Sequence, residues 1–174
     1  MSALQQPPPV ALITAGTAGL GAATARIFAK AGIRVVVNYA NDETRALALV
    51  EELKRIFSHP MDPEVKGVVA HSEKADLSSK TDIQKLVDNT VRVMGRLDIV
   101  FSNGGWTRIR DITDLEDNLD EEDWDRCFNM NVKHHLWLMH AAKPYLDVAE
   151  GVFITTASLA GVKVSGSSLV RRSF

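Results

Sequence analysis

The chain has 174 residues, 45% of them hydrophobic, with 20 Lys and Arg, 22 Asp and Glu, and a formal net charge of -2 at pH 7. This length and apolar content predict one globular domain and argue against wholesale disorder. The balanced charge gives no basic surface, so we expect no nucleic acid and no membrane as partners. The single cysteine, Cys127, excludes an intrachain disulfide framework.

The two ends of the chain carry no recognisable targeting signal. Residues 1–9 end in three prolines and lack the basic start and apolar core of a secretion signal, so we expect a disordered tail there. No apolar run approaches the ~20 residues of a membrane span. The last four residues match no anchor motif. From these observations we expect a cytoplasmic protein.

Apolar runs alternate with helical patterns from residue 10 onward. Strands are expected at Val10–Thr14, Ile33–Tyr39, Lys66–His71, Leu97–Ser102 and Val152–Thr156. Helices are expected at Gly19–Ala31, at Asp42–Phe57, from Ser79 or Thr81 to Met94, and from Glu121 to about Leu146. Ser58–Pro63 is expected to be a loop. This alternation predicts an α/β domain with a parallel sheet between two layers of helices.

A Gly-rich turn connects the first strand to the first helix, in the order Thr14-Ala15-Gly16-Thr17-Ala18-Gly19-Leu20-Gly21. Glycines let a backbone approach a pyrophosphate closely, and a helix N-terminus offers free N–H groups and a positive dipole end to phosphates. Glycines alone would indicate only a tight turn. In this strand–turn–helix context they favour nucleotide binding.

Two other clusters admit a metal-binding interpretation. Nine acidic residues crowd positions 111–125, where we expect a solvated loop and the first turn of a helix, because they lack the spacing of a calcium loop. His134 and His140 are six residues apart on one predicted helix and share no face, so a zinc site is disfavoured. We therefore expect no metal. The large apolar residues of the same helix are expected to pack rather than to bind a cofactor.

Five segments in order resemble the short-chain dehydrogenase/reductase family. The Gly-rich turn resembles its Thr-Gly-x-x-x-Gly-x-Gly turn, although Ala15 stands where the family usually has its first glycine. Asp76-Leu77, the Ser102–Gly105 turn, the Trp124–Lys133 helix and the strand that leads to Ser158 resemble its next four signatures. The likeness covers about residues 10–168.

The resemblance implies a Rossmann-type doubly wound sheet in the strand order 3-2-1-4-5. It implies an NAD(P)(H)-dependent oxidoreductase that acts on a small-molecule carbonyl or alcohol by hydride transfer. Ser158 and Asn131 would belong to the catalytic set. The residues that would bind the cofactor are Thr14, Gly16, Gly19, Leu20, Gly21, Asn38, Tyr39, Asp76, Leu77, Asn103, Gly104 and Gly105.

The choice between NAD(H) and NADP(H) depends on the end of the second strand. NAD-binding domains place an acid ~20 residues past the glycines, where it binds the ribose 2′-hydroxyl. Here Tyr39 stands eighteen residues past Gly21, and Asn38–Asn41 contain no carboxylate. Ala18 stands where an arginine often contacts the 2′-phosphate in this family. We expect NADP(H) over NAD(H).

The family's chemistry also needs a Tyr-x-x-x-Lys motif about a dozen residues after the catalytic serine. The two tyrosines, Tyr39 and Tyr145, are followed at the fourth position by Glu43 and Ala149. We therefore expect an incomplete domain at 10–168, truncated after the fifth strand, and an aberrant tail at 169–174. A misread exon boundary, an early stop and an alternative transcript each fit.

Two functions remain open for such a chain. One is the family's oxidoreductase activity, which these residues alone would lack. The other is a non-catalytic dinucleotide-binding fragment or pseudo-enzyme that acts through a partner subunit. In the family, the missing helix packs beside the helix that begins at Glu121, and the two commonly build a dimer interface. A homo-oligomer is therefore expected, and the substrate is not readable from the sequence.

Overall fold

The computed structural model describes residues 7–57, 67–159 and 168–169. The strands are β1 (Val10–Ile13), β2 (Arg34–Tyr39), β3 (Ala70–Lys74), β4 (Ile99–Ser102) and β5 (Val152–Thr155). The helices are α1 (Gly19–Lys30), α2 (Glu43–Ile56), α3 (Lys80–Met94), α4 (Glu121–Phe128) and α5 (His134–Ala149), with a 3-10 turn η1 (Glu116–Asn118) and a π-helical segment η2 (Asn129–Lys133). None of the helices in these ranges has the length and apolar character needed to cross a membrane.

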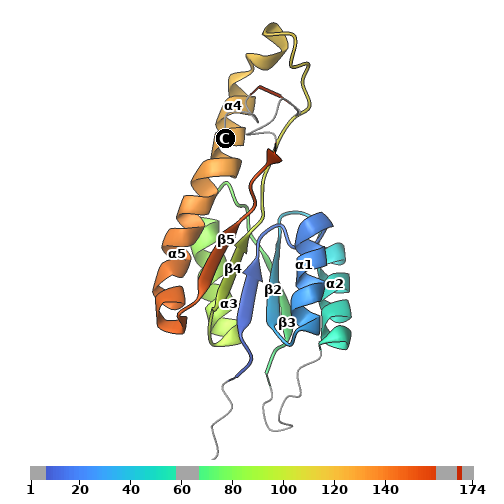
Figure 1. Ribbon diagram of the computed structural model, residues 1–174, viewed down its shortest axis with the longest axis vertical. Helices are drawn as coiled ribbons and strands as arrows, with labels where there is room; N and C mark the ends of the chain where they lie inside the picture. Colours follow the sequence, from blue (N-terminus) through green and yellow to red (C-terminus); the bar gives the residue numbers. More distant parts are fainter. Residues whose placement is uncertain (1–6, 58–66, 160–167, 170–174) are drawn as a thin grey trace, which may run out of the picture.

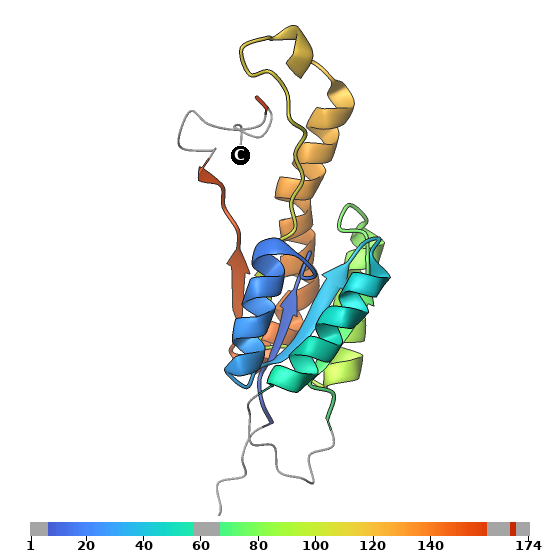
Figure 2. The same ribbon diagram turned by 90° about the vertical axis from the view of Figure 1, so that its right-hand side faces the viewer.

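The five strands form one parallel sheet in the order β3-β2-β1-β4-β5. This order confirms the predicted doubly wound topology. Helices α1 and α2 cover one face of the sheet, and α3 and α5 cover the other (Figures 1 and 2). Because the order reverses between β1 and β4, the carboxyl ends of these two strands open a crevice, where ligands bind in open α/β sheets.

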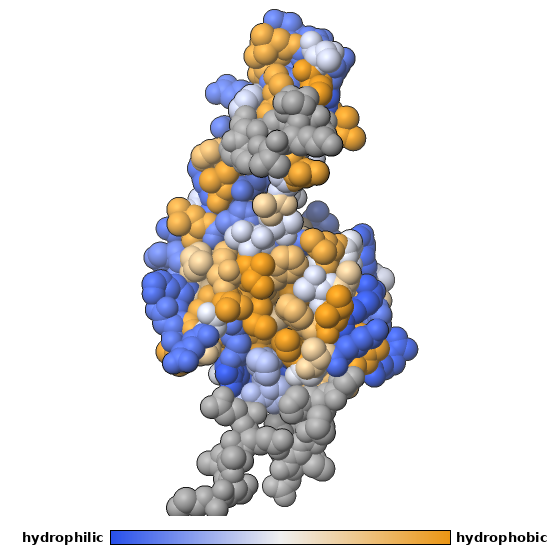
Figure 3. Space-filling view, in the orientation of Figure 1, coloured by the Kyte–Doolittle hydropathy of each residue, from blue (hydrophilic) through white to orange (hydrophobic). Residues whose placement is uncertain are grey.

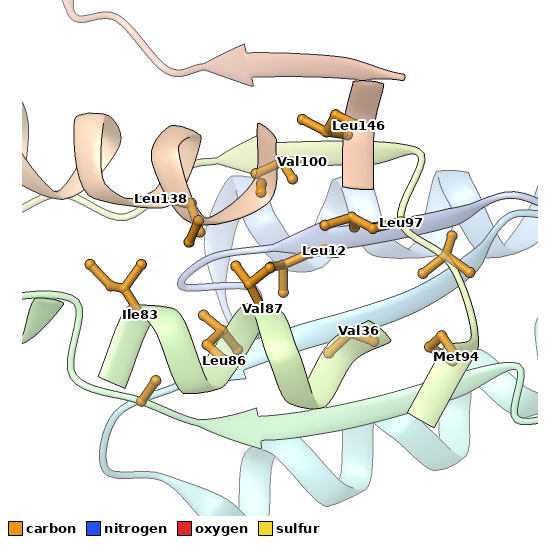
Figure 4. Close-up of a cluster of buried hydrophobic side chains, with 14 of the residues drawn as sticks. Leu12, Val36, Ile83, Leu86, Val87, Met94, Leu97, Val100, Leu138 and Leu146 are labelled. Carbon is orange, nitrogen blue, oxygen red and sulfur yellow. The ribbon is translucent and has the colours of Figure 1, made fainter. Parts of the chain in front are cut away.

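Two apolar clusters hold the layers together, one on each face of the sheet. The first joins α3 and α5 to the sheet, with Leu86, Leu138 and Leu12 all fully buried or nearly so (Figure 4). The second joins α1 and α2 to the opposite sides of β1 and β2. β1 and β2 are buried along their whole length, which explains the apolar runs Val10–Ile13 and Val35–Val37 in the sequence.

The helix boundaries follow local capping. Asp42 and Ser79 accept hydrogen bonds from the backbone N–H groups of Arg45 and Asp82, at 2.9 Å and 3.2 Å, and so begin α2 and α3. Gly95 ends α3 in the left-handed region, with φ of 80°. The helix predicted from Glu121 to about Leu146 is present as an unbroken helical segment that ends at Ala149. Its middle part, η2, is π-helical and separates α4 from α5.

The predicted bounds of the third strand were wrong by three to four residues. The sequence predicted Lys66–His71, whereas β3 occupies Ala70–Lys74 and pairs with Val35–Tyr39. β3 lies at the sheet edge and only Ala70 is buried in it, so its polar residues carry no apolar signal. The predicted loop at Ser58–Pro63 lies outside the described residues.

Residues 7–9, part of the predicted tail, are fixed to the amino-terminal edge of the sheet. The Arg34 side chain donates to the Pro8 carbonyl at 3.1 Å, and the Arg34 N–H donates to the Pro9 carbonyl at 2.9 Å. Arg96 donates to the Pro7 carbonyl at 3.3 Å. Residues 1–6 lie outside the described part of the chain, and so does most of the predicted tail at 169–174.

One face of β5 has no helical cover within the described residues. Val152 and Ile154 of β5 alternate with Phe153, which packs into the first cluster, and they remain 51% and 43% exposed. Figure 3 shows apolar side chains gathered over this part of the molecule. Figure 2 shows α1 and α2 on that side of the sheet, where they contact β1, β2 and β3 and leave β5 uncovered. Sheets of this class normally bury both faces.

Candidate functional site

The Gly-rich turn lies at the carboxyl end of β1 and runs directly into α1. Ala15 adopts a left-handed conformation, with φ of 48°, where the resembled family has glycine. Gly21 fits tightly, because a Cβ on it would lie 2.6 Å from the Ala15 carbonyl oxygen. Gly16 fits equally tightly, since its Cβ would lie 2.8 Å from the Ile13 carbonyl oxygen. These two glycines therefore let the turn pack on itself and on β2.

Gly19 differs from these glycines. It has a φ of 50°, and a Cβ built on it would meet nothing within 4 Å. It is the first residue of α1, and no side chain caps this helix or places an acid in its first turn. The first N–H groups of any helix lack intrahelical acceptors. Open space beside an uncapped helix N-terminus fits a phosphate group, and Gly19, Leu20 and Gly21 are the residues that would hold it.

Thr14 connects the turn to the end of β4. Its buried Oγ1 accepts the N–H of Asn103 at 2.9 Å and the N–H of Gly104 at 3.1 Å. The Asn103 side chain donates back to the Thr14 carbonyl at 3.3 Å and accepts from the Thr156 hydroxyl at 3.2 Å. The ends of β1 and β4 and the residue after β5 are therefore joined at one edge of the sheet.

Asn38 joins the turn to the strands on the other side. Its Oδ1 accepts the N–H of Ala15 at 3.1 Å, and its Nδ2 donates to the carbonyl of Ala75 at 3.0 Å. The residue is 1% exposed. Its side chain therefore holds the loops that surround a ligand rather than presenting a free amide.

A cleft of about 1030 Å³ opens at this edge of the sheet. That volume suits a ligand larger than a typical drug-sized molecule. The cleft is lined by the Gly-rich turn, by residues at the ends of β2, β3 and β4, by α3, and by α4 and η2. Its lining residues are Ala15, Asn38, Ala40, Asn41, Glu73, Lys74, Ala75, Asp76, Leu77, Ser78, Asp82, Lys85, Asn89, Gly104, Gly105, Trp106, Glu122, Asp125, Arg126, Asn129 and Met130.

The sequence-derived candidates divide into three groups around this cleft. Asn38, Asp76, Leu77, Gly104 and Gly105 line it. Thr14, Gly16, Gly19, Leu20, Gly21 and Asn103 form or support the Gly-rich turn beside it. Tyr39 does neither, because it is 8% exposed and its hydroxyl donates to Glu43 at 3.2 Å. Burial, followed by this hydrogen bond, raises the pKa of Tyr39 above its ordinary value.

Asp76 and Leu77 present different surfaces to the cleft. The Asp76 carboxylate is exposed and accepts the N–H and the hydroxyl of Ser78, both at 2.8 Å. Leu77 is buried against Gly104, where any Cβ would lie 2.3 Å from the leucine Cδ1. Glycine at position 104 therefore permits the contact that forms the floor of the cleft.

Asn131 lies in η2, in the middle of the helical run. Its Oδ1 accepts the N–H of Trp106 at 3.0 Å, and its Nδ2 donates to the Trp106 carbonyl at 2.8 Å. The same Nδ2 lies 2.9 Å from the buried Cys127 sulfur. A π-helical turn often marks a functional position, and this one aims an amide at the segment that follows Gly105. Ser158, the other catalytic candidate, is half-buried three residues past β5 and does not line the cleft.

Trp106 was not predicted as a site residue, although it directly follows the Gly104–Gly105 turn. Trp106 lines the cleft, and the Arg126 guanidinium lies 4.6 Å from the centre of its ring. Arg108 approaches the same ring at 5.7 Å. The contact joins the segment after β4 to α4 across one wall of the cleft.

A polar cluster under the site was also missed. The Ser102 hydroxyl lies 2.6 Å from His135 Nδ1 and 3.3 Å from His134 Nε2. His134 is fully buried, and burial, reinforced by His135, lowers its pKa to about 4. Burial also lowers the pKa of His135. Both histidines are therefore neutral at pH 7, which the helical spacing of the sequence does not reveal.

The acid-rich segment is held by arginines. Arg110 pairs with Asp117, Asp120 and the buried Asp123 at 3.2, 3.0 and 2.8 Å. The hydrogen bond that Arg110 donates to Asp123 raises the pKa of Arg110 above its ordinary value. No three His, Cys, Asp or Glu side chains in the described part of the chain gather as metal ligands.

Comparisons with known proteins agree on one family. A family profile described as short chain dehydrogenase matches residues 9–169. A short-chain dehydrogenase/reductase of Pestalotiopsis microspora is 34% identical over 151 residues, which cover 87% of this chain and 52% of that protein. A hydroxynaphthalene reductase of Aspergillus fumigatus is 30% identical over 160 residues, which cover 92% of this chain and 54% of that protein. The chain thus spans about half the length of the curated relatives it matches.

A solved structure extends the likeness to three dimensions. The crystal structure of an NADH-dependent reductase responsible for alginate metabolism superimposes with a TM-score of 0.82 at 25% sequence identity. The match covers 95% of this chain and 65% of that one. The sheet and the helices around it are therefore arranged as in that reductase.

Proposed function

Because the chain belongs to the short-chain dehydrogenase/reductase family, we propose that it binds a nicotinamide dinucleotide in the cleft at the carboxyl edge of its sheet. The whole protein is proposed to transfer a hydride between this cofactor and a small-molecule carbonyl or alcohol. The observation that carries the proposal is the open N-terminus of α1 at Gly19, beside a cleft that begins at Ala15.

The polar network around the turn supports this proposal. A ligand that spans the crevice must meet the ends of β1 and β4 in a fixed relation, and Thr14 fixes it through two hydrogen bonds. Asn38 fixes the other side through Ala15 and Ala75. A prearranged site loses less conformational entropy when it binds its ligand. Asp76 and Leu77 are proposed to contact the adenine ring.

NADP(H) is proposed over NAD(H). The lining residues at the end of β2 are Asn38, Ala40 and Asn41, and none of them is a carboxylate. A carboxylate there would repel a 2′-phosphate and bind a 2′-hydroxyl instead. Tyr39, which stands at the discriminating spacing, does not face the cleft, so the residues just after it are proposed to decide the preference.

Ser158 and Asn131 are proposed to belong to the catalytic site of the whole enzyme. Ser158 would polarise and orient the substrate carbonyl. Asn131 would fix the segment at Trp106 through its two hydrogen bonds. Proton transfer needs a tyrosine followed by a lysine at the fourth position, a pattern that the 174 residues do not contain. We therefore propose that these residues bind the dinucleotide without turning over substrate by themselves.

A second function is favoured by the uncovered face of β5. Val152 and Ile154 expose apolar surface that another polypeptide could cover, either a second copy of the chain or a partner subunit. In that role the chain would be a non-catalytic dinucleotide-binding subunit. The cytoplasmic location expected from the sequence stays a prediction.

Titration of residues 1–174 with NADPH and with NADH, followed by cofactor fluorescence, tests the binding proposal. We expect saturable binding, tighter for NADPH. An assay of NADPH oxidation with a panel of ketones and quinones tests the inactivity proposal, for which we expect no turnover. Absence of binding to both cofactors would contradict the first proposal. NADPH consumption that disappears in Ser158→Ala would contradict the second.

A further inference from the structure

The end of β3 places a lysine beside the residues proposed to decide the cofactor preference. Lys74 is the last residue of β3 and pairs in register with Tyr39, the last residue of β2. It is exposed, and it lines the cleft together with Ala40 and Asn41. Neighbouring strands lie only ~4.8 Å apart, so the Lys74 stem begins one strand away from this pair.

The pleat of the sheet sends Lys74 and its neighbour Glu73 to opposite faces. Successive side chains of a strand alternate, so Lys74 shares a face with Ala70, which packs into the cluster under α2. Glu73 lies on the α3 face, where Asn89 donates to its carboxylate at 2.7 Å and His71 lies 3.3 Å away. Glu73 also lines the cleft, but its carboxylate is engaged by Asn89 on the α3 side of the sheet.

Two other cations among the described residues line the cleft, and both come from other walls. Arg126 lies over the Trp106 ring on α4, beside the end of β4. Lys85 lies on α3, one turn past Asp82, whose carboxylate accepts the Asp76 N–H at 3.2 Å. Since β1 separates β4 from β2, Arg126 is two strands away from Ala40 and Asn41. Lys74 alone of the three comes from the strand paired with β2.

We propose that the Lys74 ammonium binds the 2′-phosphate of NADP(H) at the ends of β2 and β3, an inference that rests on the proposed dinucleotide site. A 2′-phosphate needs a cationic donor, and the end of β2 offers only the neutral residues Asn38, Ala40 and Asn41. Ala18 in the Gly-rich turn supplies no charge either. Lys74 would supply from the third strand the charge that this chain lacks in the turn.

The test compares dissociation constants of NADPH and NADH for residues 1–174 and their variants by fluorescence titration. Lys74→Gln is expected to weaken NADPH binding about tenfold or more, the effect of losing one charge-assisted hydrogen bond at an exposed site. NADH binding should stay unchanged, because NADH has no 2′-phosphate. Lys74→Arg should retain most of the preference for NADPH, and Lys74→Glu should reverse it.

Two matched variants separate a specific contact from general charge. Lys85→Gln removes the same charge from another wall of the cleft, and Lys30→Gln removes it from the far end of α1. Both should leave the ratio of the two dissociation constants unchanged. The role of Lys74 would be overturned if Lys74→Gln weakened the binding of NADPH and NADH equally or weakened neither. A wild-type chain that binds NADH alone would overturn it as well. A wild-type chain that binds neither cofactor would instead overturn the proposed function.

Discussion

The side-chain amide of Asn131 holds both backbone groups of Trp106. Trp106 N–H donates to Oδ1 at 3.0 Å, and Nδ2 donates to the Trp106 carbonyl at 2.8 Å. The contact connects the π-helical segment η2 to the residue that follows the Gly104–Gly105 turn. An asparagine is suited to this position because its side chain carries one acceptor and two donors on the same planar group.

Replacing Asn131 should therefore loosen the wall of the cleft at Trp106. Asn131→Leu removes both hydrogen bonds, and we expect a loss of about 1–3 kcal/mol in the free energy of unfolding. Asn131→Asp keeps an acceptor for the Trp106 N–H but faces the Trp106 carbonyl with a second acceptor, so it should also destabilise the chain. Urea denaturation measures both. Unchanged midpoints in both variants would contradict the role given to this amide.

Glycine should fit the backbone conformation at position 15 better than the alanine that stands there. Its φ of 48° lies in the left-handed region, which costs an L-residue roughly 1–2 kcal/mol and costs glycine almost nothing. Part of this gain is lost because glycine makes the unfolded chain more flexible, so we expect Ala15→Gly to stabilise by about 0.5–1 kcal/mol. The control is Ala31→Gly at the end of α1, where φ is -80° and glycine should destabilise. Thermal unfolding decides the sign for each variant.

The buried histidine predicts a loss of stability in acid. The pKa of His134 is about 4 in the folded chain and near 6.5 when unfolded, so between these values the unfolded chain binds more protons. Its contribution is complete above about pH 6.5 and is lost as the pH falls towards 4. Between pH 7 and pH 5 the free energy of unfolding should fall by about 2 kcal/mol through this group.

Two variants isolate that contribution. His134→Gln should reduce the pH dependence of the unfolding free energy over this range, whatever its effect on stability at pH 7. His140→Gln, at an exposed position on the same helix, should retain the wild-type dependence. If the unfolding free energy depends on pH equally in the wild type and in His134→Gln, another group controls the loss of stability in acid.

The uncovered face of β5 should make the 174-residue chain marginally stable and prone to association. Apolar surface left in water forfeits ~25 cal/mol per Å², while whole domains are stable by only ~5–15 kcal/mol. Ile154→Lys should weaken self-association measured by sedimentation velocity. Val148→Lys, at an 88% exposed position on α5, should leave it unchanged. A wild-type chain that stays monomeric and unfolds in one sharp transition would contradict this expectation.

The strands β1 and β2 and the Gly-rich turn were predictable because each depends on local pattern, whereas the strand order came from the resemblance to the family. β1 and β2 are buried runs, and Gly16, Gly19 and Gly21 stand between a strand and a helix in the spacing that phosphate binding requires. β3 was misplaced because an edge strand with one buried residue, Ala70, carries no apolar periodicity. Its last residue, Lys74, was therefore never considered beside the end of β2.

The side-chain hydrogen bonds of the site were not predictable for a different reason. Asn38 was expected to bind the cofactor, and it lines the cleft; its amide is held by Ala15 and Ala75, which only the folded chain brings together. The contacts of Ser102 with His134 and His135 join residues more than thirty positions apart. Tyr39 was chosen by spacing alone, and the pleat of β2 buries its ring away from the cleft.

The central claim, that a dinucleotide binds against the N-terminus of α1, is tested most directly by a matched pair of glycine variants. Gly19 and Gly95 both have left-handed φ values, 50° and 80°, and a Cβ on either meets nothing within 4 Å. Gly19→Val and Gly95→Val should therefore impose similar backbone strain, but only the first places a side chain where the pyrophosphate is expected. NADPH titration should show binding abolished in Gly19→Val and retained in Gly95→Val. Equal affinities in the two variants would contradict the account.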